Sequence, residues 1–299
     1  MPDRLPAYDR GRMIPHEEIR SAANPRVRQA SLLRDANARR ETGLTLIDGR
    51  RELATAVAKG VAIVELFLDA EMLRASSLPA SDPLKEQAFV DWLQALVARG
   101  TQILALSRKA FERIAFGSRN EGCVGVARYS APTLDQLNVA ECLPVLLVEG
   151  VEKPGNLGAI LRTADASGIG GVIVCDGRTD PANPAVIRAS LGTVFTVPLA
   201  VASTQQGLDW CRLNGRRIVA AMPAGESLWY KTDLVDNVAI LLGSEAHGIS
   251  PLWQQAAASG VLRFLSVRLP MVGRADSLNV SATAAVLAYE AWRQREQQA

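Results

Sequence analysis

The chain has 299 residues, which is enough for two domains of roughly 100–200 residues each. With 48% hydrophobic and 21% charged residues, the composition is that of a globular protein with a sizeable core. The formal net charge of +2 is too small to indicate nucleic-acid binding by itself. Residues 1–40 nevertheless hold nine arginines against five acids. Such a segment can contact phosphates or can simply be the solvated face of a helix.

Several protein classes are disfavoured by what the sequence lacks. No apolar run approaches the ~18 residues of a membrane span, and the polar first residues hold no apolar stretch of a secretion signal. The four cysteines are scattered without a C-x-x-C pair, so we expect buried, reduced thiols and a cytosolic protein. With only two histidines, no zinc or other metal site is expected.

Strands and helices alternate in the first part of the chain, which is typical of an α/β unit with a mostly parallel sheet. Asn24 and Pro25 predict the start of the first helix, as N-cap and first helical residue. We place this domain at residues 14–130, with an insertion at 76–85. The expected strands are 44–49, 62–69, 101–107 and 123–129, and the expected helices are 25–33, 50–59, 82–99 and 109–116.

A linker is expected at residues 131–143, which hold turn residues and little periodicity. A second α/β domain at 144–299 repeats the alternation more strongly. Its expected strands are 145–149, 172–175, 194–197, 217–221, 238–242 and an extended stretch at 262–269. Its expected helices lie near 156–168, 184–191, 204–213, 250–259 and 278–294.

Three stretches of this second domain set glycine and small polar residues directly after an apolar run, at 150–158, 243–249 and 270–279. In an open parallel sheet, ligands bind beyond the carboxyl ends of the strands. Since all three loops follow expected strands, we expect them to share one crevice.

Taken singly, each polar residue of these loops also has a structural explanation. Arg162 and Asp165 can form a surface ion pair on one helix. Glu245 can cap the helix that follows it, and Ser277 and Asn279 can cap the last helix. The first loop is neither a P-loop nor a G-x-G-x-x-G dinucleotide motif, which disfavours a nucleotide-dependent oxidoreductase.

Together, three motifs in this order resemble those of the SpoU/TrmH-type RNA ribose 2′-O-methyltransferases of the SPOUT class. They are N-x-G-x-x-x-R at 156–162, G-S-E-x-x-G at 243–248 and L-P-M-x-G-x-x-x-S-L-N-V-S at 269–281. The first domain looks more loosely like the ribosomal-protein-L30e-type RNA-binding domain, with residues 40–53 as its clearest local cue.

The resemblance implies a deep trefoil knot in the second domain, although chains as a rule do not knot. It also implies a homodimer through this domain, with a site that takes residues from both protomers. S-adenosylmethionine would bind in the knot. The matching cofactor-binding residues are Leu242, Gly243, Ser244, Glu245, Gly248, Leu269, Met271, Gly273, Ser277 and Leu278.

The resemblance further implies five catalytic residues: Asn156, Arg162, Glu245, Ser277 and Asn279. The family's proposed base is the arginine, yet a guanidinium stays protonated in proteins, so a bidentate clamp on a phosphate is the easier role. Glu149 and Glu245 can hold loop amides or the arginine in place. The candidate RNA contacts are Arg162 and Arg188, with Arg26, Arg28, Arg50 and Arg51 in the first domain.

We therefore expect an S-adenosylmethionine-dependent RNA ribose 2′-O-methyltransferase. The first domain favours ribosomal RNA, and 23S rRNA before other RNAs. Methylation of tRNA and a non-catalytic RNA-binding protein of the same fold remain the alternatives.

Overall fold

The computed structural model describes residues 18–71, 86–116 and 121–298. The chain forms two compact units: residues 1–130 with 182–188, and residues 131–181 with 189–299. The predicted insertion at 76–85 lies outside the described residues.

The first unit is built on a five-stranded sheet in the order β1-β4-β3-β5-β2. Strand β5 runs antiparallel to both of its neighbours, whereas β4 is parallel to β1 and β3. The sheet is therefore mixed, and the expectation of a mostly parallel sheet is wrong. The strands are β1 (Glu18–Ile19), β2 (Leu44–Asp48), β3 (Ile63–Asp69), β4 (Gln102–Leu106) and β5 (Cys123–Arg128).

Polar caps mark the first helices of this unit. Asn24 accepts a hydrogen bond from the amide of Arg26, and Pro25 opens the helix, as predicted. A second helix, capped by Asp35, was missed because its seven residues carry no apolar period. The helices are α1 (Pro25–Leu32), α2 (Ala36–Thr42), α3 (Arg50–Ala58), α5 (Glu86–Ala98) and α6 (Arg108–Phe111).

The second unit holds a seven-stranded sheet in the order β10-β12-β9-β11-β6-β7-β8, and every pairing in it is parallel. Its strands are β6 (Val145–Glu149), β7 (Gly171–Cys175), β8 (Leu199–Ala202), β9 (Arg217–Ala221), β10 (Ser227–Leu228), β11 (Val238–Leu242) and β12 (Phe264–Arg268). Its helices are α7 (Pro154–Ser167), α9 (Thr204–Leu213), α10 (Pro251–Ala258) and α11 (Val280–Glu296). Helix α8 (Pro184–Ala189) groups with the first unit up to Arg188.

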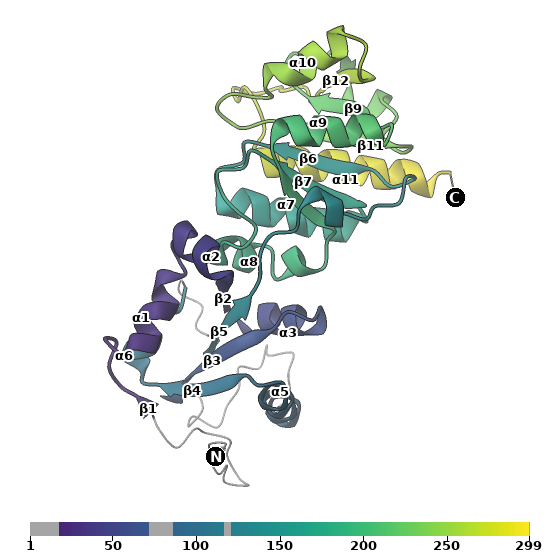
Figure 1. Cartoon of the computed structure of the whole chain (residues 1–299). Coiled ribbons are helices and arrows are strands. Elements are labelled where there is room, and N and C mark those ends of the chain that lie inside the picture. Colours follow the sequence, from purple (N-terminus) through teal and green to yellow (C-terminus); the bar gives the residue numbers. More distant parts are fainter. Residues whose placement is uncertain (1–17, 72–85, 117–120, 299) are drawn as a thin grey trace. The chain divides into compact units, whose positions relative to one another are not determined.

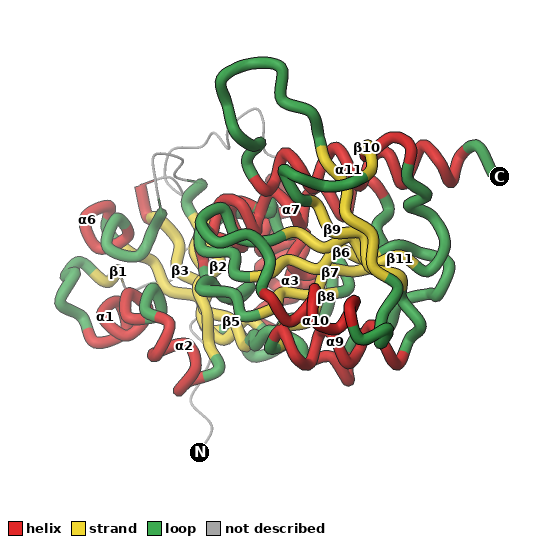
Figure 2. Tube along the Cα trace, turned by 90° about the horizontal axis from the view of Figure 1, so that it is seen from above, coloured by secondary structure: helices red, strands yellow, loops and turns green. Residues whose placement is uncertain are grey.

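Helices cover both faces of this sheet, with α7 and α11 on one face and α9 and α10 on the other (Figures 1 and 2). Strands β6, β7 and β11 are buried along their whole length, which explains why they read as unbroken apolar runs. On the α9 and α10 face, Leu208, Cys211 and Trp253 pack into the core. Because these strands are parallel, their carboxyl ends lie along the same edge of the sheet.

One expected strand of this unit, at 194–197, is wrong. Residues Thr193–Phe195 form a 3-10 turn, and the strand is β8, five residues later. Leu191 and Gly192 both take a positive φ there, so the chain turns sharply instead of extending. Val194 is buried all the same, at 2% exposure, so its apolar character reports burial and not strand geometry.

The predicted alternation of strands and helices in the second unit is confirmed. The trefoil knot stays a prediction from the resemblance. Across the described residues, the helices are all too short or too polar to cross a bilayer.

Candidate active site

Three loops of the second unit meet at one carboxylate. The side chain of Glu245, in the loop after β11, accepts hydrogen bonds at Oε1 from Asn156 Nδ2 at 2.9 Å and from Asn279 Nδ2 at 2.7 Å. Its Oε2 lies 2.9 Å from Lys153 Nζ. We call these four residues the Glu245 cluster. The structure thereby brings together three of the five residues that the sequence predicts as catalytic.

Helix starts place the two amides of this cluster. Asn156 lies in the first turn of α7, which Pro154 opens. Asn279 is the N-cap of α11, and its Oδ1 accepts the amide of Ser281 at 2.9 Å. The capping explanation for Asn279 is therefore correct but incomplete, because its Nδ2 still reaches Glu245.

The capping explanation for Glu245 is wrong, because the N-cap of α10 is Ser250. Hydrogen bonds, first of all from Lys153, hold the pKa of Glu245 below its usual range. A carboxylate with a lowered pKa is a weak base at neutral pH. Glu245 is thus suited to fix the two amides rather than to remove a proton.

Lys153 was not singled out from the sequence. It precedes Pro154 and stands three residues before Asn156, so the two side chains can share one side of the helix start. That spacing is the only signal that the sequence offers for it.

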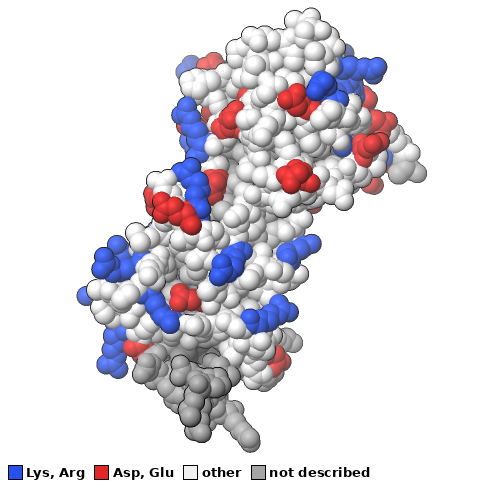
Figure 3. Space-filling model, viewed as in Figure 1, with Lys and Arg blue, Asp and Glu red and all other residues white. Residues whose placement is uncertain are grey.

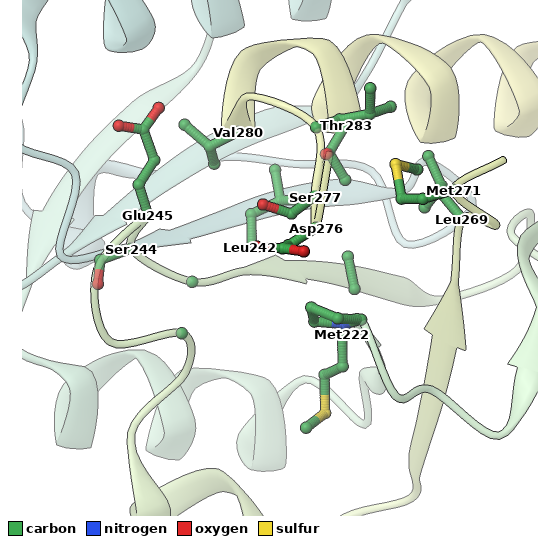
Figure 4. A pocket seen from close by; sticks show the side chains of 15 residues that line it. Met222, Leu242, Ser244, Glu245, Leu269, Met271, Asp276, Ser277, Val280 and Thr283 are labelled. Carbon is green, nitrogen blue, oxygen red and sulfur yellow. The ribbon is translucent and has the colours of Figure 1, made fainter. Parts of the chain in front are cut away.

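Beside the cluster lies a pocket of about 190 Å³, walled by the ends of β9, β11 and β12 and by the start of α11 (Figure 4). Of the predicted cofactor-binding residues, only Gly273 is outside its described lining. The lining also contains residues that the sequence did not indicate. The full lining is Ala221, Met222, Pro223, Leu242, Gly243, Ser244, Glu245, Gly248, Leu269, Met271, Asp276, Ser277, Leu278, Val280 and Thr283.

The residues that line this pocket favour a ligand that carries a positive charge and an apolar part. The described lining holds two carboxylates, Glu245 and Asp276, and no lysine, arginine or histidine. Met222, Leu242 and Met271 offer apolar surface. A phosphate-bearing dinucleotide would lack a basic partner here, whereas the flat adenine and the sulfonium of S-adenosylmethionine fit such walls. The residues present therefore suit that cofactor.

A second pocket of about 240 Å³ lies on the Lys153 side of the cluster. It shares Gly243, Ser244, Glu245 and Val280 with the first. Its other lining residues are Gly150, Val151, Glu152, Lys153, Asn156 and Ala246. Two adjoining pockets with a common wall are what a group transfer between two molecules requires.

Two predicted catalytic residues lie apart from the cluster. Ser277 lines the first pocket. Arg162 is exposed on α7 and lies outside the described lining of both pockets. Within the described residues it forms no ion pair with Asp165, whose Oδ1 instead accepts the hydroxyl of Thr196 at 3.0 Å. The ion-pair explanation for Arg162 is therefore wrong.

Two of the predicted RNA contacts serve the first unit itself. Arg50 is 4% exposed, its guanidinium lies 4.2 Å from the centre of the Phe89 ring, and its Nε donates to the Glu121 carbonyl. Arg188 forms an ion pair of 2.9 Å with Asp48, whose pKa burial raises to about 6. Arg50 is therefore not on the surface, which corrects the expectation that it meets phosphates.

The other arginines of the first unit differ in how available they are. Arg26 pairs with Glu65 at 3.2 Å, whereas Arg28 and Arg51 are exposed. On the face seen in Figure 3, basic side chains prevail over acidic ones on the surface of this unit. Arg28 and Arg51 remain the clearest candidates for RNA contacts.

Comparison with known proteins agrees with the site. Residues 144–289 match the SpoU rRNA Methylase family, and residues 24–125 match the MRM3-like substrate binding domain. The chain is 32% identical to the 23S rRNA (guanosine-2'-O-)-methyltransferase RlmB of Vibrio cholerae, over 68% of this chain and 82% of that protein. The chain belongs to the SpoU rRNA methylase family.

Other members of the SpoU family match nearly the whole chain. The 23S rRNA (uridine(2479)-2'-O)-methyltransferase of Streptomyces viridochromogenes is 28% identical over 97% of this chain and 96% of its own length. The SpoU methyltransferase AviRb of the same organism, solved with the cofactor AdoMet, superposes with a TM-score of 0.77 at 27% identity, covering 91% of this chain and 98% of that one. Both units are thus shared with relatives, and not the SpoU half alone.

Proposed function

We propose that this protein transfers a methyl group from S-adenosylmethionine to a ribose 2′-hydroxyl of ribosomal RNA, in the large-subunit 23S rRNA. The observation that carries this proposal is the Glu245 cluster in a SpoU-family chain, because Glu245 lines both pockets and its partners Lys153 and Asn156 line the second. Relatives that cover both units and are named as 23S rRNA methyltransferases favour this RNA over tRNA. The buried cysteines 123, 175 and 211 agree with a cytosolic location.

In this proposal the first pocket holds the methyl donor. Its apolar walls take the adenine, while Asp276 and Glu245 attract the positive charge. The ribose enters the second pocket, against the amide of Asn156, which lines that pocket. Glu245 holds this amide and the neighbouring amide of Asn279 in place. S-adenosylmethionine supplies an already activated methyl group, so the protein's main task is to align the 2′-oxygen with it.

Arg162 then clamps the phosphate beside the target ribose, and we place it in the site of the partner protomer. Helices α7 and α11 pack against each other, and Tyr289 and Trp292 of α11 form a ring pair that is 48% and 44% exposed. Exposed aromatic pairs are typical of interfaces. A homodimer through this face covers them and leaves a route for Arg162 to a second site.

Purified protein with methyl-labelled S-adenosylmethionine and unmodified ribosomal RNA tests the activity. We expect label at one 23S rRNA ribose, read as a bond that resists alkaline cleavage. Glu245→Gln should lower kcat about 100-fold, since misplaced reactants cost that much. Protein that binds S-adenosylmethionine but labels no ribosomal RNA would contradict the proposed substrate, and label on tRNA would support the alternative.

Mixed dimers test the shared site. Arg162→Ala and Glu245→Ala damage different protomers of each proposed site, so an equal mixture that exchanges subunits should regain about a quarter of the wild-type rate. Asn156→Ala mixed with Glu245→Ala is the control, because both residues belong to one cluster and no intact site can form. Equal rates from the two mixtures would place Arg162 in its own protomer's site.

A further inference from the structure

Glu149, the last residue of β6, is a buried carboxylate without an ion-pair partner among the described residues. It is 6% exposed. Its Oε1 accepts the hydroxyl of Thr204 at 2.7 Å, and its Oε2 accepts the amide of Ser250 at 2.8 Å. A carboxylate that leaves water costs free energy unless its oxygens are hydrogen-bonded, so both bonds matter for this position.

The Ser250 amide marks the end of the loop 243–249, which carries Glu245. Backbone hydrogen bonds of 3.0 Å in both directions between Ser244 and Gly248 close this loop on itself. Gly243 packs so tightly that a Cβ there would lie 2.2 Å from the Gly248 carbonyl carbon. The loop is therefore stiff, and its position is set at its two ends.

The two ends of the loop are fixed in different ways. At its start, β11 pairs with β6, where Leu242 lies opposite Val148. At its end, the bond from Ser250 to Glu149 returns the chain to the same strand, β6. Thr204, the first residue of α9, adds a third element. Glu149 thus ties β6, α9 and the end of the loop to one point.

We propose that Glu149 is a positioning residue, which holds the loop 243–249 in the position that binding of the methyl donor requires. Glu149 is outside the described lining of both pockets, so it acts through the loop, which forms part of both. This inference rests on the proposed function, because the donor is taken to be S-adenosylmethionine. Loss of the bond to Ser250 should weaken donor binding even in protein that is fully folded.

Ser250 offers a matched pair of variants that tests this bond. Its φ of −68° is the angle that proline imposes, so Ser250→Pro removes the amide donor without straining φ. The ring Cδ then takes the place of the amide hydrogen and pushes the Glu149 carboxylate away. Its buried hydroxyl has no hydrogen-bond partner among the described residues, so Ser250→Ala removes a group that makes no such bond there. Ser250→Pro therefore tests the loss of the N–H bond together with the displacement of Glu149, and Ser250→Ala is its control. Glu149→Leu is the complementary change, because it removes both acceptor oxygens and leaves residue 250 unchanged.

The readout is the dissociation constant of S-adenosylmethionine by titration calorimetry, well below the melting temperature of each variant. We expect Ser250→Pro and Glu149→Leu to raise this constant about tenfold, the effect of losing one buried hydrogen bond. Ser250→Ala should stay within about twofold of the wild type. A merely structural role would lower the melting temperature and leave this constant unchanged.

Unchanged donor affinity in folded Ser250→Pro or Glu149→Leu overturns the inference. If Ser250→Pro does not fold, Glu149→Leu decides alone. A wild-type protein that binds no S-adenosylmethionine overturns the proposed function first and this inference with it, so the two failures are told apart by the wild-type titration.

Discussion

At the scale of single residues, Lys153 is the member of the Glu245 cluster that the sequence analysis missed. Its side chain is 70% exposed and that of Glu245 35%, so their ion pair adds little to stability. The pair matters for Glu245 itself, whose pKa it lowers, and so for the amides that Glu245 holds. The residues Asn156, Glu245 and Asn279 were predicted because they lie in the three motifs that carry the family resemblance, in loops after expected strands. A contact between two distant loops, such as Lys153 to Glu245, has no such mark.

Replacement of Lys153 by methionine tests this role. The pKa of Glu245 should rise toward its ordinary value, because the hydrogen bond that lowers it is gone. The cluster needs the ionised carboxylate, so activity falls as pH drops through that pKa. The acid limb of the pH–rate profile should therefore move to higher pH, while kcat at neutral pH falls about tenfold.

The profile is measured between about pH 3 and 7, which brackets the ordinary glutamate pKa of about 4.3, with Lys109→Met, an equal change of charge on the first unit, as the control. An acid limb that coincides with that of the wild type would show that Lys153 does not act on Glu245.

At the scale of helices and strands, the burial of a strand was easier to predict than whether it runs parallel or antiparallel to its neighbours. The central strands β6, β7 and β11 read correctly because strands covered on both faces are apolar throughout. Strand β5 reads equally well as a strand, but its pattern does not encode that it runs against β3. Val194 shows that apolar character does not by itself specify a strand, since this residue is buried in a 3-10 turn.

The close approach of α7 to the end of α8 gives a prediction at this scale. A Cβ on Gly158 would lie 2.5 Å from Ala189 Cβ and 2.8 Å from the Ala189 carbonyl carbon, which is backbone and cannot yield cheaply. Overpacking costs about 1–3 kcal/mol, and the rigid backbone contacts place this site in the upper part of that range, against a gain of about 1 kcal/mol in helix propensity. Gly158→Ala should thus lower the free energy of unfolding by about 1–2 kcal/mol.

Gly155 is the matched control, because it lies in the same helix and a Cβ there meets nothing within 4 Å. Gly155→Ala should be neutral or slightly stabilising. Urea unfolding of both variants measures the difference, and equal stability of the two would mean that α7 can shift away from Ala189 at little cost.

At the scale of the whole molecule, the domain bounds 14–130 and 144–299 stay a prediction. The first compact unit takes residues 1–130 together with 182–188, and residues 131–143 group with the second unit. The sequence gave no sign that residues 182–188 pack with the first unit, because that grouping depends on contacts such as Arg188 with Asp48, far apart in the chain. Periodicity reports which face of an element is buried, and not which partner buries it.

Arg28 and Arg51 give the prediction that belongs to this scale, a division of labour between the units. Both are exposed on the first unit, which matches a substrate binding domain. If they contact RNA phosphates, Arg28→Ala with Arg51→Ala should weaken binding of ribosomal RNA about tenfold and lower the salt slope by about one per lost contact. Affinity for S-adenosylmethionine should not change, because both described pockets are lined by the second unit alone.

Arg212→Ala is the control for this double variant, since it removes an exposed positive charge from α9 of the second unit. Filter binding at several salt concentrations gives the slope, because each phosphate contact releases counterions on binding. A slope equal to that of the wild type would remove Arg28 and Arg51 from the RNA surface. A parallel loss of donor affinity would instead mean that the first unit supports the pocket, and the two tasks would not be separate.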